Sequence, residues 1–433
     1  MKLNSGMSLL KKSWVLFSLL IFISAFSKAK AESVVASDGG KPWERRDVTK
    51  VRAAKSPDEL NQYGGFKGEK VEEPGYFRVI KKSKDWWLVD PEGCLFLSIG
   101  VNSVEPERVG RSDVEAWTNE TADLLKGARF NTIGRWSDPR AFKQAGRRIP
   151  WCNTLGFMTQ YSKQRSSEFG EAGLYEDTIP VFDGAWPKFC EEYAMEKAKP
   201  HTEDPWLLGH FSDNELPFRP DALQKYLDLP EDDAGHQGAL KWMEENRVRK
   251  GKVDDPKVQA KFLEFVARRY FEVVAAALEK ADPNHLYIGS RLHGRCINES
   301  VLRASEVCDV VSINYYHRWE GEKDRTRDWT KWSERPFLVG EFYAMKVSSK
   351  RTKADGAGFR VLSYEDAGAF YHTYVNSLLE NIPNCVGWHW FKYANDNADY
   401  EKGIVGQKGE VHAPLIKAMK EVNEQAYSLR GLQ

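Results

Sequence analysis

The sequence lacks the short motifs that mark metal-dependent, nucleotide-dependent and serine-dependent enzymes. Its nine histidines form no HExxH pair and its six cysteines form no CxxC pair. It contains neither a GxxxxGK[ST] phosphate loop nor a GxSxG turn. Because those signatures place the catalytic groups of the corresponding enzymes, we expect no metal site and no cofactor.

An excess of charge of either sign is also absent. The 63 basic residues balance the 63 acidic ones, whereas a nucleic-acid-binding domain needs a basic surface. This balance argues against a nucleic-acid partner. The number of subunits is not encoded in any feature of the sequence.

Long apolar runs are missing, and the one near the N-terminus, 14–26, is too short to span a membrane comfortably. Lysines precede this run, and Ala29-Lys30-Ala31 follows it with the small-x-small pattern of a signal-peptidase site. We expect 1–31 to be a signal peptide, with a retained membrane anchor as the alternative. The mature protein would then be periplasmic or extracellular and would have no membrane span.

The cysteine spacings do not suggest a disulfide framework. Cys94, Cys308 and Cys385 lie within or beside predicted strands, and the other three are scattered. Buried free thiols are therefore the expected state for most of the six.

Two apolar runs end in a glutamate. The stretch 205–216 closes with Asn214 and Glu215, and the stretch 336–343 contains Glu341 after a buried-type run. Any single glutamate among 63 acidic residues is most often a solvated surface charge. The pair is more informative, because carboxylates at the carboxyl ends of parallel strands face one another and can cleave a glycosidic bond.

Three segments make up the predicted domain organisation: the signal peptide at 1–31, a polar and loosely ordered lead-in at 32–75, and a catalytic domain at 76–433. Cleavage after Ala31 would leave 433 − 31 = 402 residues, enough for one large barrel. The domain should begin with a β-hairpin over 76–89, in which Trp86 and Trp87 serve packing.

Strands and helices then alternate, which predicts an α/β fold with a parallel sheet. The predicted strands are 95–102, 130–136, 149–157, a fourth that ends in Asn214 and Glu215, 285–291, 307–315, 337–341 and 385–391. The predicted helices are 112–128, which begins with a capping box of Ser112 and Glu115, then 186–199, 256–280, 363–380 and 414–426, and the clearest of them is 256–280. Eight strands predict a (β/α)8 barrel with loop insertions over its C-terminal face, among them the charged insertion 217–255.

Polar and aromatic residues close most of the predicted strands and should meet at one mouth. Strand ends are polar in any such fold, but two glutamates beside cations, amides, hydroxyls and tryptophans exceed that expectation. Besides Glu215 and Glu341, the candidates are Asn102, Arg135, Trp136, Asn214, Arg291, His293, Asn314, Tyr315, Tyr316, His317, Trp388 and Trp390.

Several blocks resemble glycoside hydrolase family 50, the β-agarases, within the retaining enzymes of clan A. The blocks are Trp87-Leu88-Val89-Asp90-Pro91-Glu92-Gly93, Phe211-Ser212-Asp213-Asn214-Glu215, Gly340-Glu341-Phe342-Tyr343-Ala344, Gly356-Ala357-Gly358-Phe359 and Gly387-Trp388-His389-Trp390-Phe391-Lys392-Tyr393. The resemblance extends from about Tyr76 to the C-terminus. The resemblance implies cleavage of β-1,4-galactosidic linkages in an agar-type algal galactan.

By the same resemblance, Glu215 is the acid/base and Glu341 the nucleophile of a double displacement, with carboxyls about 5–5.5 Å apart. Glu215 must start protonated, which burial and the nearby Glu341 charge would favour. Arg135 is the expected partner that keeps Glu341 ionised, and a hydroxyl of Tyr315 or Tyr316 would orient it.

The sugar itself should meet an amide and an aromatic wall. Asn214 suits the 2-hydroxyl, a contact that strengthens in the transition state. We expect one of the two tryptophans on the last strand, Trp388, to face the cleft and the other, Trp390, to pack outward.

Alternatives stay open at this point. A β-galactosidase or a porphyran or carrageenan hydrolase would share both glutamates, and a polysaccharide-binding barrel would keep the aromatic cleft without the chemistry. Only about 45 mature residues precede Tyr76, where the family has a sizeable β-sandwich-like region, so exo or endo action is not fixed. The basic residues after Glu341 form either a solvated loop or a clamp on an anionic galactan; they are Lys346, Lys350, Arg351, Lys353 and Arg360.

Overall fold

The computed structural model describes residues 33–49, 60–169, 177–347, 356–382, 384–397 and 400–432. The predicted signal peptide lies outside these residues, as do Lys350, Arg351 and Lys353. The chain divides into a unit at 1–31 and a unit at 32–433, and only the second is described below. Within the described ranges, no helix combines the length and the apolar character that crossing a bilayer requires.

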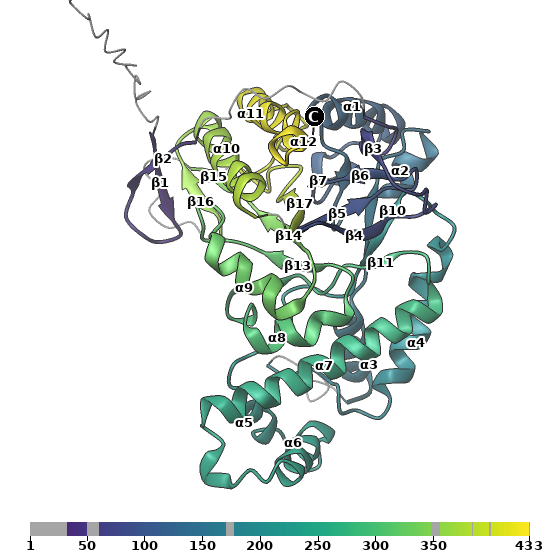
Figure 1. The fold of residues 1–433 in the computed structure, drawn as a ribbon, viewed down its shortest axis with the longest axis vertical. Coiled ribbons are helices and arrows are strands. Elements are labelled where there is room, and N and C mark those ends of the chain that lie inside the picture. Colours follow the sequence, from purple (N-terminus) through teal and green to yellow (C-terminus); the bar gives the residue numbers. More distant parts are fainter. Residues whose placement is uncertain are drawn as a thin grey trace, which may run out of the picture. The chain divides into compact units, whose positions relative to one another are not determined.

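A sheet of nine parallel strands forms the centre of the molecule (Figure 1). Its hydrogen-bonded order is β11-β10-β9-β8-β7-β17-β14-β13-β12. The strands are β7 (Ser98–Val101), β8 (Thr132–Ile133), β9 (Trp151–Thr154), β10 (Leu207–Phe211), β11 (Leu286–Tyr287), β12 (Leu292–His293), β13 (Val311–Asn314), β14 (Phe337–Phe342) and β17 (Cys385–Trp390).

The predicted eight-stranded (β/α)8 barrel is wrong. The single strand expected over 285–291 is two strands, β11 and β12, which stand at the two ends of the sheet order. Gly289 and Arg291 interrupt the extended backbone, because their φ values are 76° and 54° and a strand requires negative φ. No pairing between β11 and β12 joins the two ends within the residues described, so the fold is α/β with an open row of nine parallel strands.

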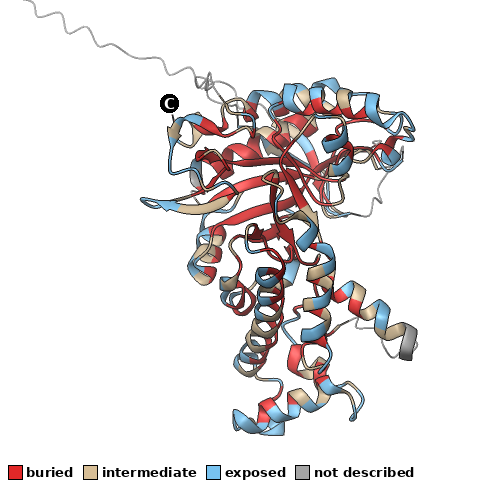
Figure 2. Cartoon of the chain, turned by 90° about the vertical axis from the view of Figure 1, so that its right-hand side faces the viewer, coloured by how far each residue is buried: buried red, intermediate tan, exposed pale blue. Residues whose placement is uncertain are grey.

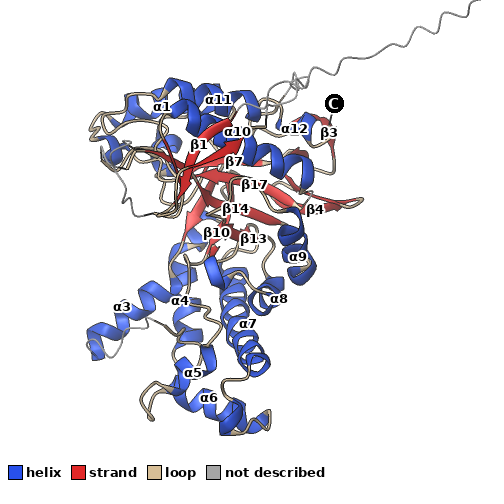
Figure 3. Ribbon diagram, turned by 90° about the vertical axis from the view of Figure 1, so that its left-hand side faces the viewer, coloured by secondary structure: helices blue, strands red, loops and turns tan. Residues whose placement is uncertain are grey.

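Helices connect these strands and cover the sheet (Figure 3). They are α1 (Val114–Gly127), α2 (Pro139–Gln144), α3 (Phe157–Phe169), α4 (Trp186–Lys197), α5 (Ala222–Leu227), α6 (Ala234–Glu245), α7 (Pro256–Ala281), α8 (Glu299–Ala304), α9 (Lys323–Ser333), α10 (Tyr364–Asn381), α11 (Ala413–Asn423) and α12 (Ala426–Leu429). Short 3-10 turns are η1 (Pro106–Val109), η3 (Lys199–His201), η4 (Lys250–Lys252), η5 (Gly294–Cys296) and η6 (Ser305–Val307).

The longest helix, α7, begins where the sequence predicted. The Asp255 side chain accepts a hydrogen bond from the Lys257 amide, and Pro256 occupies the first turn, where its missing N–H costs nothing. Residues such as Phe262, Val266 and Tyr270 form the buried stripe. The predicted insertion 217–255 contains α5 and α6, which lie beyond α7 from the sheet (Figure 1).

Two four-stranded sheets flank the central one. The first has the order β3-β6-β5-β4 and contains the predicted hairpin, in which Arg78 pairs with Val89 across β4 and β5. The second has the order β15-β16-β1-β2. The strands are β1 (Ser33–Asp38), β2 (Glu44–Asp47), β3 (Phe66–Lys70), β4 (Arg78–Lys82), β5 (Asp85–Val89), β6 (Cys94–Phe96), β15 (Ala344–Lys346) and β16 (Phe359–Val361).

The lead-in 32–75, expected to be loosely ordered, therefore contributes three strands to these sheets. β1 pairs antiparallel with β16, so this segment is tied to the chain that follows Glu341. Burial runs through the central strands while the helices expose their outer faces (Figure 2). The strand ends are thus fixed by a buried sheet and carry the polar groups described next.

Candidate active site

The two predicted catalytic glutamates lie at the carboxyl ends of strands of the central sheet. Glu341 belongs to β14, and Glu215 follows β10 with its backbone amide donating to the Arg291 carbonyl at 3.2 Å. Asn314, at the end of β13, pairs in register with Glu341. Residues that follow β10 and that close β13 and β14 therefore meet around Asn314, and the Arg291 segment before β12 lies beside them.

Glu341 is buried, with 5% of its surface exposed, and both carboxylate oxygens are held. Arg291 Nη2 donates to Oε1 at 2.6 Å, and the Tyr316 hydroxyl donates to Oε2 at 2.5 Å. Burial and the Glu341 carboxylate raise the pKa of Tyr316 well above its usual range, so the phenol remains a donor. These two charge-assisted hydrogen bonds fix the orientation of the Glu341 carboxylate.

Arg135, the predicted partner of Glu341, instead binds backbone. Its guanidinium donates to the Asp213 carbonyl at 2.8 Å and to the Leu155 carbonyl at 3.3 Å. Burial and the neighbouring Arg291 cation lower the pKa of Arg135 to about 9. The predicted pairing is wrong because the turn at Arg291 brings a nearer guanidinium to the carboxylate.

Glu215 is more exposed than predicted. Its side chain is 35% exposed, and its φ of 55° turns the chain away from the strand direction. Asn314 Nδ2 donates to Oε1 at 2.7 Å, and His293 Nδ1 lies 3.8 Å from the same oxygen. The expectation that Glu215 is buried is therefore wrong, since its side chain faces solvent.

Two predicted amides lie beside these carboxylates. Asn102 is fully buried; its Nδ2 donates to the Gly340 carbonyl at 2.9 Å and its Oδ1 accepts from the Arg135 amide at 2.9 Å. Asn214 is half-buried, and its Oδ1 accepts from Asn314 Nδ2 at 3.4 Å. Asn102 therefore supports backbone, while Asn214 presents an amide next to Glu215.

A series of rings lines the same strand ends. Trp136 contacts Phe391, Phe391 contacts Tyr343, Tyr343 contacts Tyr316, and Tyr316 contacts His293, with ring centroids 5.4–6.2 Å apart. The guanidinium carbons of Arg135 and Arg291 each lie 4.9 Å from the Trp136 ring. We call the five ring residues the aromatic arc; they are Trp136, Phe391, Tyr343, Tyr316 and His293. A pyranose ring can stack on a wall of this kind.

Four predicted site residues direct their side chains to partners other than the two carboxylates. Trp388 and Trp390 are both fully buried, and their indole nitrogens donate to the Tyr371 hydroxyl and the Lys402 carbonyl. Residues two apart on a strand share one face, so the assignment of Trp388 to the cleft and Trp390 to the outside is wrong. Tyr315 donates to Glu322 at 2.8 Å, and His317 binds Asp38 at 2.7 Å.

Sequence reasoning missed Phe391 and Tyr343 as parts of the aromatic arc. The period of two along a strand was the available signal, because Tyr343 shares the face of Glu341, and Phe391 has the opposite parity to Trp388 and Trp390. Arg291 was recognised as a strand-end cation but not as the partner of Glu341. Its positive φ, which turns it toward β14, leaves no mark in the sequence.

One group of residues has the composition of a metal site. His210, Asp282 and His285 place one ligand atom each within 4.8 Å of one another. Their ring nitrogens already have partners: His210 contacts Asn153 at 3.1 Å and Asp282 at 2.9 Å, and His285 contacts Asp282 at 2.8 Å and the Asp204 carbonyl at 2.9 Å. The arrangement is a hydrogen-bonded cluster at the start of β11, remote from the strand ends that carry Glu215 and Glu341.

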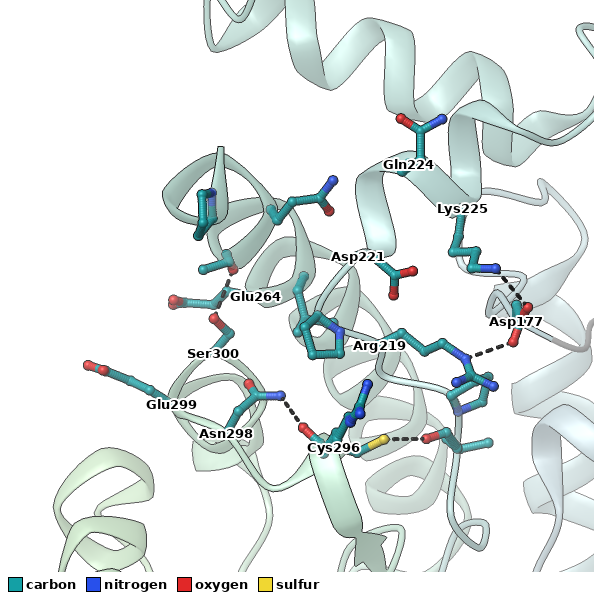
Figure 4. A pocket seen from close by; sticks show the side chains of 18 of the residues that line it. Asp177, Arg219, Asp221, Gln224, Lys225, Glu264, Cys296, Asn298, Glu299 and Ser300 are labelled. Carbon is teal, nitrogen blue, oxygen red and sulfur yellow. Dashed lines mark hydrogen bonds and ion pairs between the residues drawn. The ribbon is translucent and has the colours of Figure 1, made fainter. Parts of the chain in front are cut away.

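A cavity of about 1530 Å³ opens beside Glu215 (Figure 4). It is bounded by the segment after Glu215, by α5, by the first half of α7 and by α8. Glu215 and His293 line it, whereas Glu341 does not. The exposed carboxyl of Glu215 therefore faces a large space that the buried Glu341 does not reach.

Sequence comparison finds two relatives among characterised proteins, and no protein-family model matches the chain. β-Agarase B of Vibrio sp. (strain JT0107) is 25% identical over 486 residues, covering 85% of this chain and 50% of that protein. β-Agarase A of the same strain is 24% identical over 371 residues, covering 71% and 36%. The chain spans half the length or less of these curated relatives.

Solved structures are also similar to this chain. The crystal structure of BpGH50 matches with a TM-score of 0.83 and 26% identity over 93% of this chain and 95% of that one. The agarase AgWH50C shares the fold, with a TM-score of 0.70 and 22% identity over 87% of this chain and 67% of that one. Together these relatives confirm the resemblance to the family 50 β-agarases.

Proposed function

We propose that the protein is a retaining glycoside hydrolase that cleaves β-1,4-galactosidic linkages of an agar-type galactan by double displacement. The observation that carries the proposal is the contrast between two neighbouring carboxylates. Glu341 is buried and accepts a hydrogen bond at each carboxylate oxygen, while Glu215 is exposed toward a cavity. The substrate class comes from the β-agarases that the chain resembles.

In the first step Glu341 attacks the anomeric carbon, and the bond to the leaving oxygen breaks as that oxygen takes the proton of Glu215. This step requires carboxyls about 5–5.5 Å apart. Arg291 and Tyr316 hold the nucleophile in one orientation, which supports an attack from a fixed direction. Asn314 holds Glu215 at 2.7 Å while leaving its exposed side accessible.

In the second step Glu215, now ionised, removes a proton from water, and the hydroxide attacks the anomeric carbon and releases Glu341. Exposure of Glu215 suits this exchange, because water must reach it after the leaving group departs. Asn214 and the aromatic arc would bind the sugar whose linkage is broken, with Trp136 and Phe391 as its stacking faces.

The test is release of reducing ends from agarose, porphyran, carrageenan and an aryl β-galactoside. Glu341→Ala should abolish release, and azide should partly restore it by occupying the vacated space. Glu215→Gln should impair polysaccharide cleavage far more than that of an aryl galactoside with a good leaving group. If only another galactan is cleaved, the double displacement stands and the agar-type substrate is wrong. Unimpaired turnover by Glu341→Ala would contradict the double displacement itself.

We propose in addition that the protein is exported and cleaved after Ala31, because of the basic, apolar and small-residue pattern at 1–31. Sequencing the N-terminus of the secreted protein tests this. A mature chain that begins at Glu32 is the expected result, and an intact Met1 in the cytoplasm would contradict it.

A further inference from the structure

The cavity beside Glu215 differs in chemistry from the aromatic arc. No Trp, Tyr or Phe is among the described residues that line it, whereas six carboxylates and five Lys or Arg side chains are. At about 1530 Å³ it exceeds the roughly 300–1,000 Å³ of a small-molecule pocket. It has room for an extended ligand and lacks the rings on which a sugar would stack.

Three of its five cations already pair with carboxylates of the wall. Arg219 and Lys225 both pair with Asp177, at 2.7 and 3.1 Å, and Arg303 pairs with Glu299 at 2.6 Å. Figure 4 shows the pairs around Asp177 at one side of the cavity. A polyanion would meet more carboxylates than unpaired cations, so the lining disfavours a sulfated ligand. Paired charges still offer donors and acceptors to hydroxyl groups.

The position of the cavity relative to the reaction follows from Glu215. A general acid touches the leaving oxygen, so space that opens from Glu215 away from the nucleophile lies on the leaving-group side. Cys296 links this space to the site, because its thiol donates to the Leu216 carbonyl at 3.3 Å. Cys296, Arg219 and Glu215 all line this cavity.

We propose that this cavity binds the leaving-group portion of the substrate, and that it takes an uncharged oligosaccharide through hydrogen bonds to its paired charges. The proposal rests on the function proposed above. It divides recognition in two: the aromatic arc holds the sugar that Glu341 attacks, and the charged cavity holds the chain that departs.

Kinetics with substrates of different leaving groups test the cavity. Arg219→Ala and Arg295→Ala, both exposed residues of the lining, should lower kcat/KM about tenfold for long neutral agaro-oligosaccharides. An aryl β-galactoside has no sugar on that side and should lose much less. Arg327→Ala is the matched control, because Arg327 is also exposed and pairs with Asp324 outside the cavity.

Equal losses on both substrates, or no loss on either, would overturn the cavity proposal. Failure of the function itself looks different, since the wild-type protein would then cleave neither substrate. If the wild type cleaves both, Glu341→Ala cleaves neither and Arg219→Ala leaves the dependence on chain length unchanged, only the cavity proposal falls.

Binding without turnover tests the charge preference. Titration calorimetry of Glu341→Ala with a neutral and a sulfated oligosaccharide of equal length should show tighter binding of the neutral one. Adding Arg219→Ala should weaken that binding about tenfold. Tighter binding of the sulfated sugar would overturn the assignment of an uncharged ligand.

Discussion

Gly340 lies between the two side chains that hold the carboxylates. A Cβ atom built there would sit 2.8 Å from Asn314 Oδ1 and 3.1 Å from Arg291 Nε. Asn314 binds Glu215 and Arg291 binds Glu341. Only glycine therefore allows both side chains to keep their places.

We predict that Gly340→Ala lowers kcat about a hundredfold, because displacement of Asn314 and Arg291 by a few tenths of an ångström misplaces both carboxylates. Steady-state kinetics measure the loss, and circular dichroism checks that the fold persists. Gly127→Ala is the control: a Cβ there meets nothing within 4 Å, and the helix should gain about 0.5–1 kcal/mol. Full activity of Gly340→Ala would show that the two side chains are not needed where they lie.

Asp213, directly before the Asn214-Glu215 pair, is buried and accepts from the Tyr270 hydroxyl at 2.6 Å. Burial raises its pKa from 3.8 to about 7. Between about pH 4 and pH 7 the unfolded chain loses this proton first. The contribution of Asp213 to stability is therefore complete below about pH 4 and is lost as the pH rises through 7.

We predict that the free energy of unfolding of the wild type falls relative to Asp213→Asn by about 1.4 kcal/mol per pH unit across this window. Urea denaturation at several pH values between 4 and 8 measures the difference. Parallel curves for the two proteins would show that Asp213 does not titrate in the folded state.

At the scale of residues, the sequence sufficed for Glu341, Glu215 and Asn314, because apolar runs that end in polar side chains mark strand ends. It did not suffice for the contacts among them. Which guanidinium reaches Glu341 depends on the positive φ of Arg291, and that conformation has no signal in a non-glycine residue.

Among the elements, the strand β1 reaches the site from the other end of the chain. Asp38, at its last position, is 4% exposed and binds His317 Nδ1 at 2.7 Å and Lys41 Nζ at 2.6 Å. His317 directly follows Tyr316, which donates to Glu341. The hairpin of β1 and β2 therefore fixes the turn that orients the nucleophile.

We predict that Asp38→Asn lowers kcat/KM severalfold, because the loss of one charge loosens His317 and so the Tyr316 hydroxyl. Kinetics on agarose provide the measurement. Asp324→Asn is the matched control, since the Asp324 carboxylate is 87% exposed and pairs with Arg327 on α9. The activity of this variant should equal that of the wild type. An equal effect of both substitutions would contradict a positioning role for β1.

The His210, Asp282 and His285 cluster joins β10, the end of α7 and the start of β11. Asp282 is buried, and burial is outweighed by His210 and His285, which hold its pKa well below the usual range. We predict that Asp282→Ala costs about 3–5 kcal/mol of unfolding free energy while turnover per folded molecule is preserved. Denaturant melts measure the cost, and Asp123→Ala at an exposed carboxylate should stay within about 0.5 kcal/mol.

Predicted elements agree with the structure wherever the pattern is local. The predicted helix 256–280 is α7, and the predicted strand 337–341 is β14. The segment 285–291 failed because its apolar run continues through Gly289, whose turn divides one expected strand into two.

For the molecule as a whole, all six cysteines are free and five of them are buried. Burial raises the pKa of Cys152 to about 12 and those of Cys94 and Cys385 to about 11, so reactive thiolates are scarce at neutral pH. We predict that at most one thiol, the half-buried Cys296, reacts with Ellman's reagent in the native protein and that six react in guanidinium chloride. Fewer than six in denaturant would reveal a disulfide.

The architecture was less predictable than its parts. Counting strands in the sequence gave eight and a closed barrel, while the structure has nine in an open row. The polar lead-in looked unstructured because β1 and β2 find their partner far away in sequence. Pairing between distant segments is invisible to periodicity, which reports only on neighbours.

That pairing also sets an order of events during synthesis. Ser37 pairs with Arg360, a separation of 360 − 37 = 323 residues, so β1 has only β2 beside it until the ribosome has passed Val361. Contacts between such distant segments form slowly, because a long loop must close first. The hairpin of β1 and β2 is therefore synthesised first but pairs with β16 late. A nascent chain released before residue 359 would lack β16 and could not form this pairing.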